Sequence, residues 1–404
     1  MKRPFISRRV ISLAASMLAS LLVGIAYSWS VYVNPLALQY GWSEAQISLA
    51  YTVNVTAMAL APVLCAPLRA RLSISAYTLA GAAVYGGGIV LSGFISGSIY
   101  ELYLYFGVMT GSGIGIVYLS LASYVVRLFP ERKGLAAGLY TACYGCGALF
   151  WAPLASHFIA AHGISWAFRC LGIFFFLALL LVTRFLHEIP AEETEVNRAG
   201  QAPVKSGQRE YSPRDLVLSP TYYVIIVIYA CGLSSGMMLM SLGSPIIQGS
   251  LGYSPESAAV LVGLFAPAQT LGRLLWGWIS DSWGRCNVLA LVSLFSSLGA
   301  LLLALTEKEI IFLIALFSIP LCYGAYASLL SPLAVETFGV RHFAMNYNLL
   351  FLSFALAALM GPQVAAYVKS SFGGYQGAFA GVALFSALAF IFTLILRRRR
   401  AGAS

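Results

Sequence analysis

Charge is what this 404-residue chain has least of. Only 9% of its residues are charged and 60% are hydrophobic, whereas roughly 25% of the residues of a typical soluble domain are charged. The composition therefore excludes an ordinary globular protein. Several apolar runs also reach or exceed the roughly 20 residues that a helix needs to cross a bilayer. With a mean hydropathy of +0.83, the chain is predicted to be an all-α integral membrane protein.

Acids and histidines are missing from the middle of these runs. All 14 Asp and Glu residues and all four histidines fall in loops or near segment ends. A membrane enzyme would need an acid, a His pair or a nucleophile arrangement inside the membrane, so we do not expect an enzyme. Cys143 and Cys146 form a CxxC without a second pair. We therefore expect neither a metal nor a cofactor.

Apolar runs between charged or Gly/Pro-containing breaks predict twelve spanning helices. The basic start "MKRPFISRR" is that of a signal peptide, but the apolar run after it is too long for a signal, so it is kept as the first helix. The predicted segments are 10–33, 46–67, 75–96, 102–126, 134–160, 166–187, 220–248, 257–280, 287–306, 309–333, 343–368 and 375–396.

The basic residues predict the orientation, because Lys and Arg accumulate in cytoplasmic loops. With the N-terminus inside, twenty of the 24 basic residues are cytoplasmic, Lys308 and Lys369 are outside, and Arg169 and Arg273 lie within helices. We expect a multi-pass protein of the cell membrane with both termini cytoplasmic. The net charge of +10 then reflects topology and an anionic inner leaflet, and no nucleic-acid partner is expected.

A polar, Pro-punctuated stretch divides the chain into two halves. Residues 188–219 are predicted to be a cytoplasmic linker between six-helix halves at 1–187 and 220–404, the second ending in a basic tail. A weak repeat supports this division, because Phe129, Arg132 and Pro153 recur 209 residues later as Phe338, Arg341 and Pro362. Such a shift is expected of two related halves.

Arg273 is the unusual charge. It stands in "QTLGRLLWGWISDSWGR", about 12 Å from the cytoplasmic edge at 1.5 Å per residue. A charge at the bilayer centre costs roughly 2.5–3.5 kcal/mol, and no intramembrane carboxylate is present to pair with it. One interpretation is that backbone carbonyls cap the guanidinium. The other is that an anionic ligand is its counter-ion, which suits the planar fork of donors.

Several motifs carry a resemblance to a known superfamily. The loop "GWISDSWGR", with Gly277, Asp281, Gly284 and Arg285, resembles the gating motif of the major facilitator superfamily, although the corresponding loop "APLRARLSIS" lacks the Asp and the second Gly. The stretches "YSWSVYVNPL", "GWSEAQISLAYT", "FPERKGLAAGLYTACYGCGAL" and "NYNLLFLSFALAALMGP" are similar to the oxalate:formate antiporter family and its monocarboxylate-transporter relatives. The resemblance implies a twelve-helix major facilitator fold that transports by alternating access.

The resemblance also implies a shared site, because helices one, four, seven, eight, ten and eleven contribute to the cavity in that superfamily. Counting from the predicted cytoplasmic edge puts Tyr118, Tyr326 and Phe354 near the depth of Arg273. We expect Tyr229 and Tyr323 nearby. The predicted substrate-binding set is Arg273, Tyr118, Tyr326, Phe354, Tyr229, Tyr323, Gln269 and Asn346.

The resemblance also indicates which class of carboxylate is the expected substrate. In relatives that carry oxalate, a second cation is implied a few residues after the Asn-Tyr motif. Aligning on Asn346 and Tyr347 places Phe354 there. One cation beside an aromatic ring favours a small monocarboxylate such as lactate or pyruvate, because a second carboxylate would be buried unpaired. A dicarboxylate antiporter and a sensor that binds a carboxylate without moving it remain alternatives.

The sequence is compatible with two ways of driving transport, anion exchange and proton symport. The cost of moving an uncompensated Arg273 through an occluded state favours anion exchange. Proton symport asks for a titratable group, and where monocarboxylate relatives carry an Asp one turn before the arginine, this chain has Gln269. We therefore expect the partners to be a small carboxylate anion, with or without a proton, and the lipid bilayer. The chain is expected to be a monomer.

Overall fold

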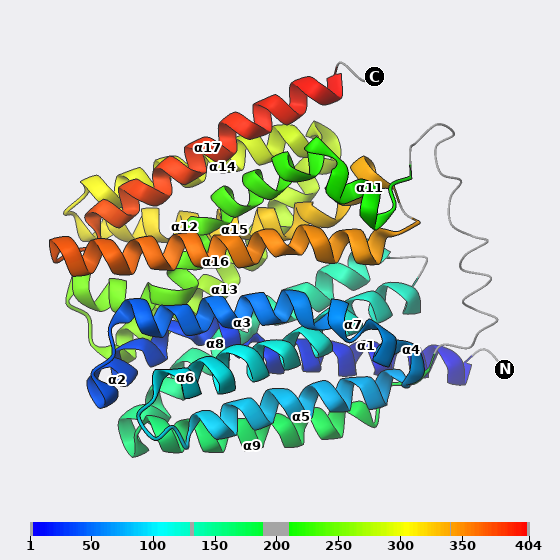
Figure 1. Ribbon diagram of the computed structural model, residues 1–404, viewed down its shortest axis with the longest axis horizontal. Coiled ribbons are helices and arrows are strands. Elements are labelled where there is room, and N and C mark those ends of the chain that lie inside the picture. Colours follow the sequence, from blue (N-terminus) through cyan, green and yellow to red (C-terminus); the bar gives the residue numbers. More distant parts are fainter. Residues whose placement is uncertain (1–2, 130–132, 189–209, 340, 402–404) are drawn as a thin grey trace.

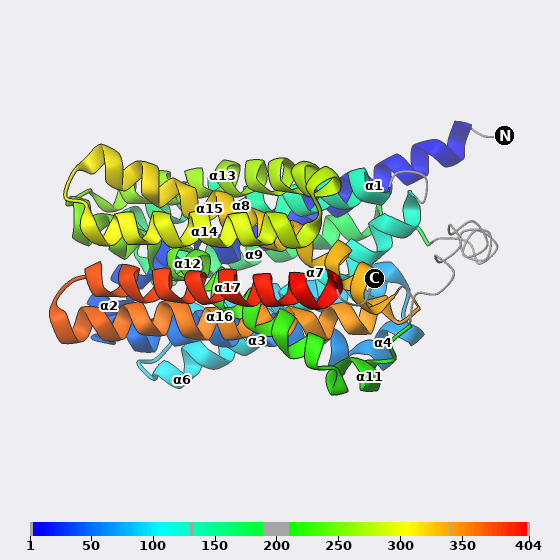
Figure 2. The ribbon, with the colours of Figure 1, turned by 90° about the horizontal axis from the view of Figure 1, so that it is seen from above.

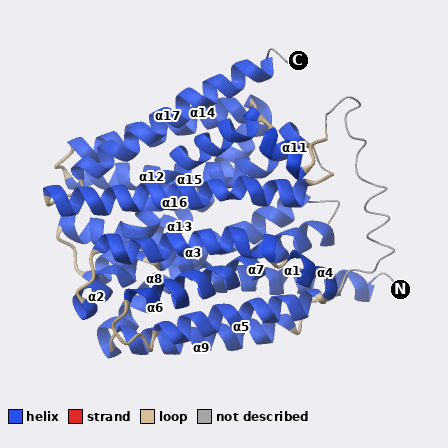
Figure 3. Cartoon of the chain, in the orientation of Figure 1, coloured by secondary structure: helices blue, strands red, loops and turns tan. Residues whose placement is uncertain are grey.

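The structure, a computed structural model, describes residues 3–129, 133–188, 210–339 and 341–401. Helices account for nearly all of these ranges, and loops gather at the two ends of the helix bundle (Figure 3). The helices of the first half are α1 (Arg3–Val23), η1 (Gly24–Ser28), α2 (Ser30–Tyr40), α3 (Glu44–Leu64), α4 (Ala66–Arg71), α5 (Ile74–Ser92), α6 (Ile99–Leu102), η2 (Tyr103–Thr110), α7 (Gly111–Leu128), α8 (Lys133–His162) and α9 (Ile164–Thr183). Those that follow are α11 (Pro213–Leu218), α12 (Pro220–Leu251), α13 (Pro255–Trp283), α14 (Arg285–Leu305), α15 (Glu309–Phe338), α16 (Phe343–Phe372) and α17 (Gln376–Ala401).

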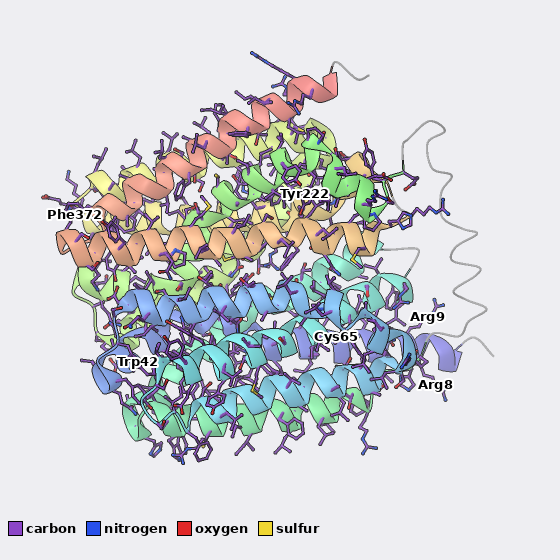
Figure 4. The ribbon with its side chains drawn as sticks, viewed as in Figure 1. Arg8, Arg9, Trp42, Cys65, Tyr222 and Phe372 are labelled. Carbon is purple, nitrogen blue, oxygen red and sulfur yellow. The ribbon has the colours of Figure 1, made fainter. Side chains whose placement is uncertain are left out.

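The long helices run side by side in two groups, α1 to α9 and α12 to α17 (Figure 1). In the described part of the chain, 11 helical segments are long and apolar enough to cross a membrane, and the 30-residue α8 is the remaining long helix of the bundle. Both chain ends lie at one end of the bundle, where Arg8 and Arg9 also lie, whereas Trp42 and Phe372 lie at the opposite end (Figure 4). The predicted all-α membrane fold of two six-helix halves is confirmed.

Two spans that the sequence predicts as continuous α-helices are interrupted. The first contains the 3₁₀ turn η1, where Gly24 packs against the backbone of Gly147 on α8 so closely that a side chain on either glycine would collide. The fourth contains η2, a π-helix, followed by Gly111, which lies directly against the backbone of Asn54. Short π segments are frequent at functional sites, and hydropathy does not reveal them.

Most of the predicted linker, residues 189–209, lies outside the described residues, as does Arg132 of the predicted repeat. Of the described linker residues, 188 and 210–219, the second group includes the short helix α11, which Ser212 and Asp215 cap at its start. The backbone N–H of Tyr211 donates to the carbonyl of Phe338 at 3.0 Å. This part of the linker therefore packs on the second half. The boundaries of the two halves stay a prediction.

The two halves meet along α3 with α16 and along α8 with α13 (Figures 1 and 2). At the end opposite the termini, the carboxylate of Glu44 on α3 pairs with the Lys369 ammonium on α16 and accepts a hydrogen bond from the Tyr375 hydroxyl at 2.7 Å. We call these three residues the outer network. Nearby, Asn34 Nδ2 donates to Gln248 Oε1 at 2.9 Å. These contacts hold the halves together at the end that the sequence predicts to be external.

Candidate binding site

A cavity lies between the two halves. Its volume is about 60 Å³, several times the roughly 10–15 Å³ that one water molecule needs. Residues of η1, α3, α7 and α8 in the first half and of α12, α13, α15 and α16 in the second half line it. Arg273 and six tyrosines form much of its polar wall, the tyrosines being Tyr27, Tyr51, Tyr118, Tyr144, Tyr323 and Tyr347.

Arg273 is 8% exposed and reaches across the interface between the halves. Its Nη1 donates to the backbone carbonyl of Thr141 on α8, and its Nη2 lies 3.4 Å from Gln269 Oε1. Its Nε has no hydrogen-bond partner, and no carboxylate of the described residues forms an ion pair with it. The Thr141 carbonyl thus accepts one of the guanidinium donors, as the capping interpretation expects. The positive charge of Arg273 nevertheless has no counter-ion among the described residues.

Two glycines fix the helix that carries Arg273. Gly272 on α13 lies against the backbone of Leu321 on α15. Gly324 on α15 lies against the backbone of α13: a Cβ at this position would meet the Gln269 carbonyl and would stand 2.9 Å from the backbone nitrogen of Arg273. A side chain at either glycine would collide with the neighbouring backbone. The absence of side chains therefore lets α13 and α15 touch beside the arginine, which limits its movement.

Aromatic rings line the cavity together with Arg273. The Tyr144 ring lies 4.9 Å from that of Tyr27 and 4.4 Å from that of Tyr118, between ring centroids. The hydroxyls of Tyr27 and Tyr323 are 3.1 Å apart, which joins the first half to the second. On α16, the rings of Phe351 and Phe354 stack at 4.3 Å. The wall therefore combines apolar ring faces with phenol hydroxyls that can donate to an anion.

Four residues of the predicted set come together at this cavity: Arg273, Tyr118, Tyr323 and Phe354. Gln269 is fully buried and contacts Arg273 from one turn earlier on α13, and its Nε2 has no partner.

The other three predicted residues lie elsewhere. Tyr326 points toward α12 and α14, where its ring lies against Gly232 and its hydroxyl is 2.6 Å from Ser293 Oγ. Tyr229 packs on it at 5.6 Å between ring centroids. Asn346 donates through Nδ2 to the carbonyl of Tyr211 at 3.0 Å, near the start of α16. Equal depth along a helix does not fix the direction of a side chain, which explains why the counting brought Tyr326 into the set.

The sequence reasoning missed several cavity residues, among them Tyr27, Tyr51, Asn54, Thr141 and Tyr144. A usable signal was present. Tyrosines of membrane helices gather at the two interfaces, so a tyrosine in the middle of a span is unusual. Asking which tyrosines stand near mid-span would have added Tyr144, the eleventh of the 27 residues in the predicted span 134–160, but neither Tyr27 nor Tyr51. Nothing in the sequence distinguishes Thr141, because Arg273 contacts its backbone carbonyl, a group that every residue has.

The predicted gating motif forms a local cluster of contacts in the second half. Arg285 pairs with Asp281 at 2.7 Å and with Glu336 at 3.2 Å, and it also donates to Ser280 Oγ. Gly284 has φ +86°, a left-handed conformation that favours glycine, and it starts α14. Gly277 lies one turn before Asp281 on α13. These contacts tie together the end of α13, the start of α14 and the end of α15.

The arrangement suits the binding of a small anion. Within the described ranges, no group of three or more His, Cys, Asp or Glu side chains is placed to hold a metal ion. A carboxylate at Arg273 would meet a permanently charged donor, phenol hydroxyls and apolar rings in a largely buried space. Charge-assisted hydrogen bonds are strongest in such surroundings.

Comparisons with known proteins agree with this geometry. The sequence profile of the Major Facilitator Superfamily matches residues 16–266 and 224–404. The chain is 24% identical over 385 residues to the oxalate:formate antiporter of Oxalobacter formigenes, covering 93% of this chain and 88% of that protein. It is 27% identical over 371 residues to mouse monocarboxylate transporter 12, covering 83% and 76%. The structure of the xylose transporter XylE from E. coli superposes with a TM-score of 0.73 at 12% identity, over 96% and 97% of the two chains.

Proposed function

The chain belongs to the Major Facilitator Superfamily, and we propose that it is a secondary transporter of small monocarboxylates that works by alternating access of its two halves. The observation that carries the proposal is Arg273, a buried cation without a carboxylate partner among the described residues, in the wall of a cavity shared by both halves. A substrate carboxylate would supply the missing counter-ion.

The same site suggests how binding is coupled to movement. Arg273 bonds to the Thr141 carbonyl in the opposite half. A carboxylate is a stronger acceptor than a carbonyl for a guanidinium, so a bound anion would take over the Nη1 donor that now links α13 to α8. It would also remove most of the cost of carrying the charge through an occluded state. We propose that the loaded carrier therefore changes conformation more readily than the empty one.

A monocarboxylate suits the cavity better than a dicarboxylate. Arg273 is the only Lys or Arg among the described residues that line it, and Phe351 and Phe354 occupy the wall contributed by α16. A second carboxylate would lose its hydration without gaining a cation. The likeness to an oxalate:formate antiporter and to a monocarboxylate transporter supports a carboxylate as the substrate. The single cation of the cavity, Arg273, supports a substrate with one carboxylate over one with two.

Anion exchange is the coupling that the cavity supports best. No Asp, Glu or His occurs among the described residues that line it, and Gln269, next to Arg273, cannot carry a proton. We propose that one monocarboxylate leaves as another enters, in a multi-pass protein of the cell membrane with cytoplasmic termini. We also propose that the chain acts as a monomer, because the cavity is built within one chain.

Uptake of labelled L-lactate into proteoliposomes tests the proposal. For an exchanger, uptake requires unlabelled lactate inside the vesicles and responds little to an imposed pH gradient. Uptake that follows the pH gradient into empty vesicles would replace exchange by proton symport. Binding without any uptake would identify a sensor, and the absence of both would overturn the proposed function.

A further inference from the structure

Asn54 contributes an unusual polar group to the cavity. It lies on α3 in the first half, lines the same cavity as Arg273 of the second half, and is fully buried. Its Nδ2 donates to the backbone carbonyl of Phe106 at 2.8 Å. A carbonyl can only accept a hydrogen bond, so this contact fixes which end of the amide faces Phe106.

The bond to Phe106 belongs to the π-helix η2. Phe106 lies inside the Tyr103–Thr110 segment, whose wider turns change which backbone groups pair along the helix. Thr110 makes a second side-chain bond to the segment, from Oγ1 to the carbonyl of Tyr105 at 3.0 Å. Two side chains thus support η2, but only Asn54 also lines the cavity.

With Nδ2 committed to Phe106, the other end of the amide has no partner. Asn54 Oδ1 is buried and accepts no hydrogen bond. An unpaired buried acceptor costs free energy that a ligand donor would recover. Arg273, on the other side of the interface, offers only donors, and its Nε is also unpaired. Both residues line the cavity, so one cavity residue on each half carries a buried polar atom without a partner, a donor on Arg273 and an acceptor on Asn54.

We propose that Asn54 determines specificity by accepting a hydrogen bond from the hydroxyl of a 2-hydroxy monocarboxylate whose carboxylate binds Arg273. This inference rests on the proposed function. A 2-hydroxy acid such as lactate carries a donor on the carbon next to its carboxylate. A 2-oxo acid such as pyruvate has an acceptor there, which would face Oδ1 and leave it unpaired. A site with a buried group that must be paired discriminates strongly against an analogue that cannot pair it.

The test measures kcat/KM for labelled L-lactate, pyruvate and propionate in proteoliposomes of the full-length chain. For the parent protein we expect lactate to exceed pyruvate and propionate by at least about tenfold, the effect of about 1.4 kcal/mol. The change Asn54→Leu keeps the branched shape of the side chain but removes both the Oδ1 acceptor and the Nδ2 donor to Phe106, so the lactate-to-pyruvate ratio should fall toward one. The lactate-to-pyruvate ratio does not depend on the amount of folded protein. The preference of the parent protein among the three acids tests the proposal even if the variant does not fold.

Thr110→Val is the matched control. It removes the other side-chain bond to η2 but leaves Asn54 Oδ1 unchanged, so the lactate-to-pyruvate ratio should stay that of the parent. Equal use of lactate and pyruvate by the parent, an unchanged ratio in Asn54→Leu, or the same loss in Thr110→Val would each overturn the role of Asn54 while leaving monocarboxylate transport standing. If none of the three acids is taken up or bound, the proposed function itself fails.

Discussion

Arg273 on α13 donates through Nη1 to the backbone carbonyl of Thr141 on α8, so one guanidinium connects the two halves of the protein. The contact places the buried charge where the interface between the halves and a candidate ligand cavity coincide. In an alternating-access cycle, α8 and α13 must separate and rejoin at this level. The hydrogen bond is therefore one that the substrate can replace.

The first prediction concerns the shape of the cation. Arg273→Lys keeps the charge but loses the planar fork that binds both oxygens of a carboxylate. We expect kcat/KM for lactate uptake to fall by about tenfold or more, corresponding to a loss of at least about 1.4 kcal/mol.

Arg169→Lys is the control for this change. Arg169 is also an arginine within a span, but its Nε donates to the carbonyl of Ser165 and its guanidinium lies 5.1 Å from the Phe94 ring centroid, away from the cavity. Uptake by this variant should be near that of the parent. Near-normal uptake by Arg273→Lys would count against direct contact with the substrate.

A second prediction separates two tyrosines on α15. Tyr323→Phe removes a hydroxyl of the cavity wall that lies 3.1 Å from Tyr27, so the KM for lactate should rise several-fold. Tyr326→Phe instead removes the contact with Ser293. It should lower stability by about 1 kcal/mol and leave KM unchanged. Uptake kinetics measure the change in KM, and thermal unfolding in detergent measures the change in stability. A shift of KM in Tyr326→Phe would show that the substrate does not bind in this cavity as proposed.

These tyrosines show how far the sequence alone reaches. Apolar run length and the distribution of basic residues predict the helices and their orientation, because both follow from the bilayer. Depth along a helix also follows from residue counting, which placed Arg273, Tyr118 and Phe354 at one depth, and all three line the cavity. Rotation about the helix axis depends on neighbouring helices, such as the space that Gly232 leaves for the Tyr326 ring. Residue counting contains no information about that space.

The interruptions of the first and fourth spans could not be predicted for a related reason. Hydropathy is the same for an α-helix, a 3₁₀ turn and a π segment. What distinguishes them here is contact with another helix, as where Gly24 meets Gly147 and Asn54 meets Phe106. The specificity that we propose for Asn54 depends on such a contact, so only the structure could suggest it.

A third prediction concerns the glycines beside Arg273. Gly324→Ala would place a Cβ against the Gln269 carbonyl and the Arg273 nitrogen, so α13 and α15 would have to separate. Overpacking of this kind costs about 1–3 kcal/mol. We expect a lower unfolding temperature and a loss of uptake. Gly87→Ala is the control, because nothing lies within 4 Å of its added Cβ. If both variants unfold at the temperature of the parent, the close contact between α13 and α15 is not needed.

The last prediction concerns the outer network. Glu44→Gln keeps the shape of the side chain but removes the charge that pairs with Lys369 across the two halves. Partly exposed ion pairs contribute about 0.5–1 kcal/mol, so the population with a closed outer end should fall by about two- to fivefold relative to the open one. The yield of a disulfide between Asn34→Cys and Gln248→Cys, which replace a hydrogen-bonded pair at that end, measures the closed population. Glu101→Gln is the matched control, because its carboxylate bonds to the N–H and hydroxyl of Ser96 within one half, and it should leave the yield unchanged. An equal yield in all three backgrounds would mean that the ion pair does not hold the outer end closed, and that closure depends on the packing of α3 against α16.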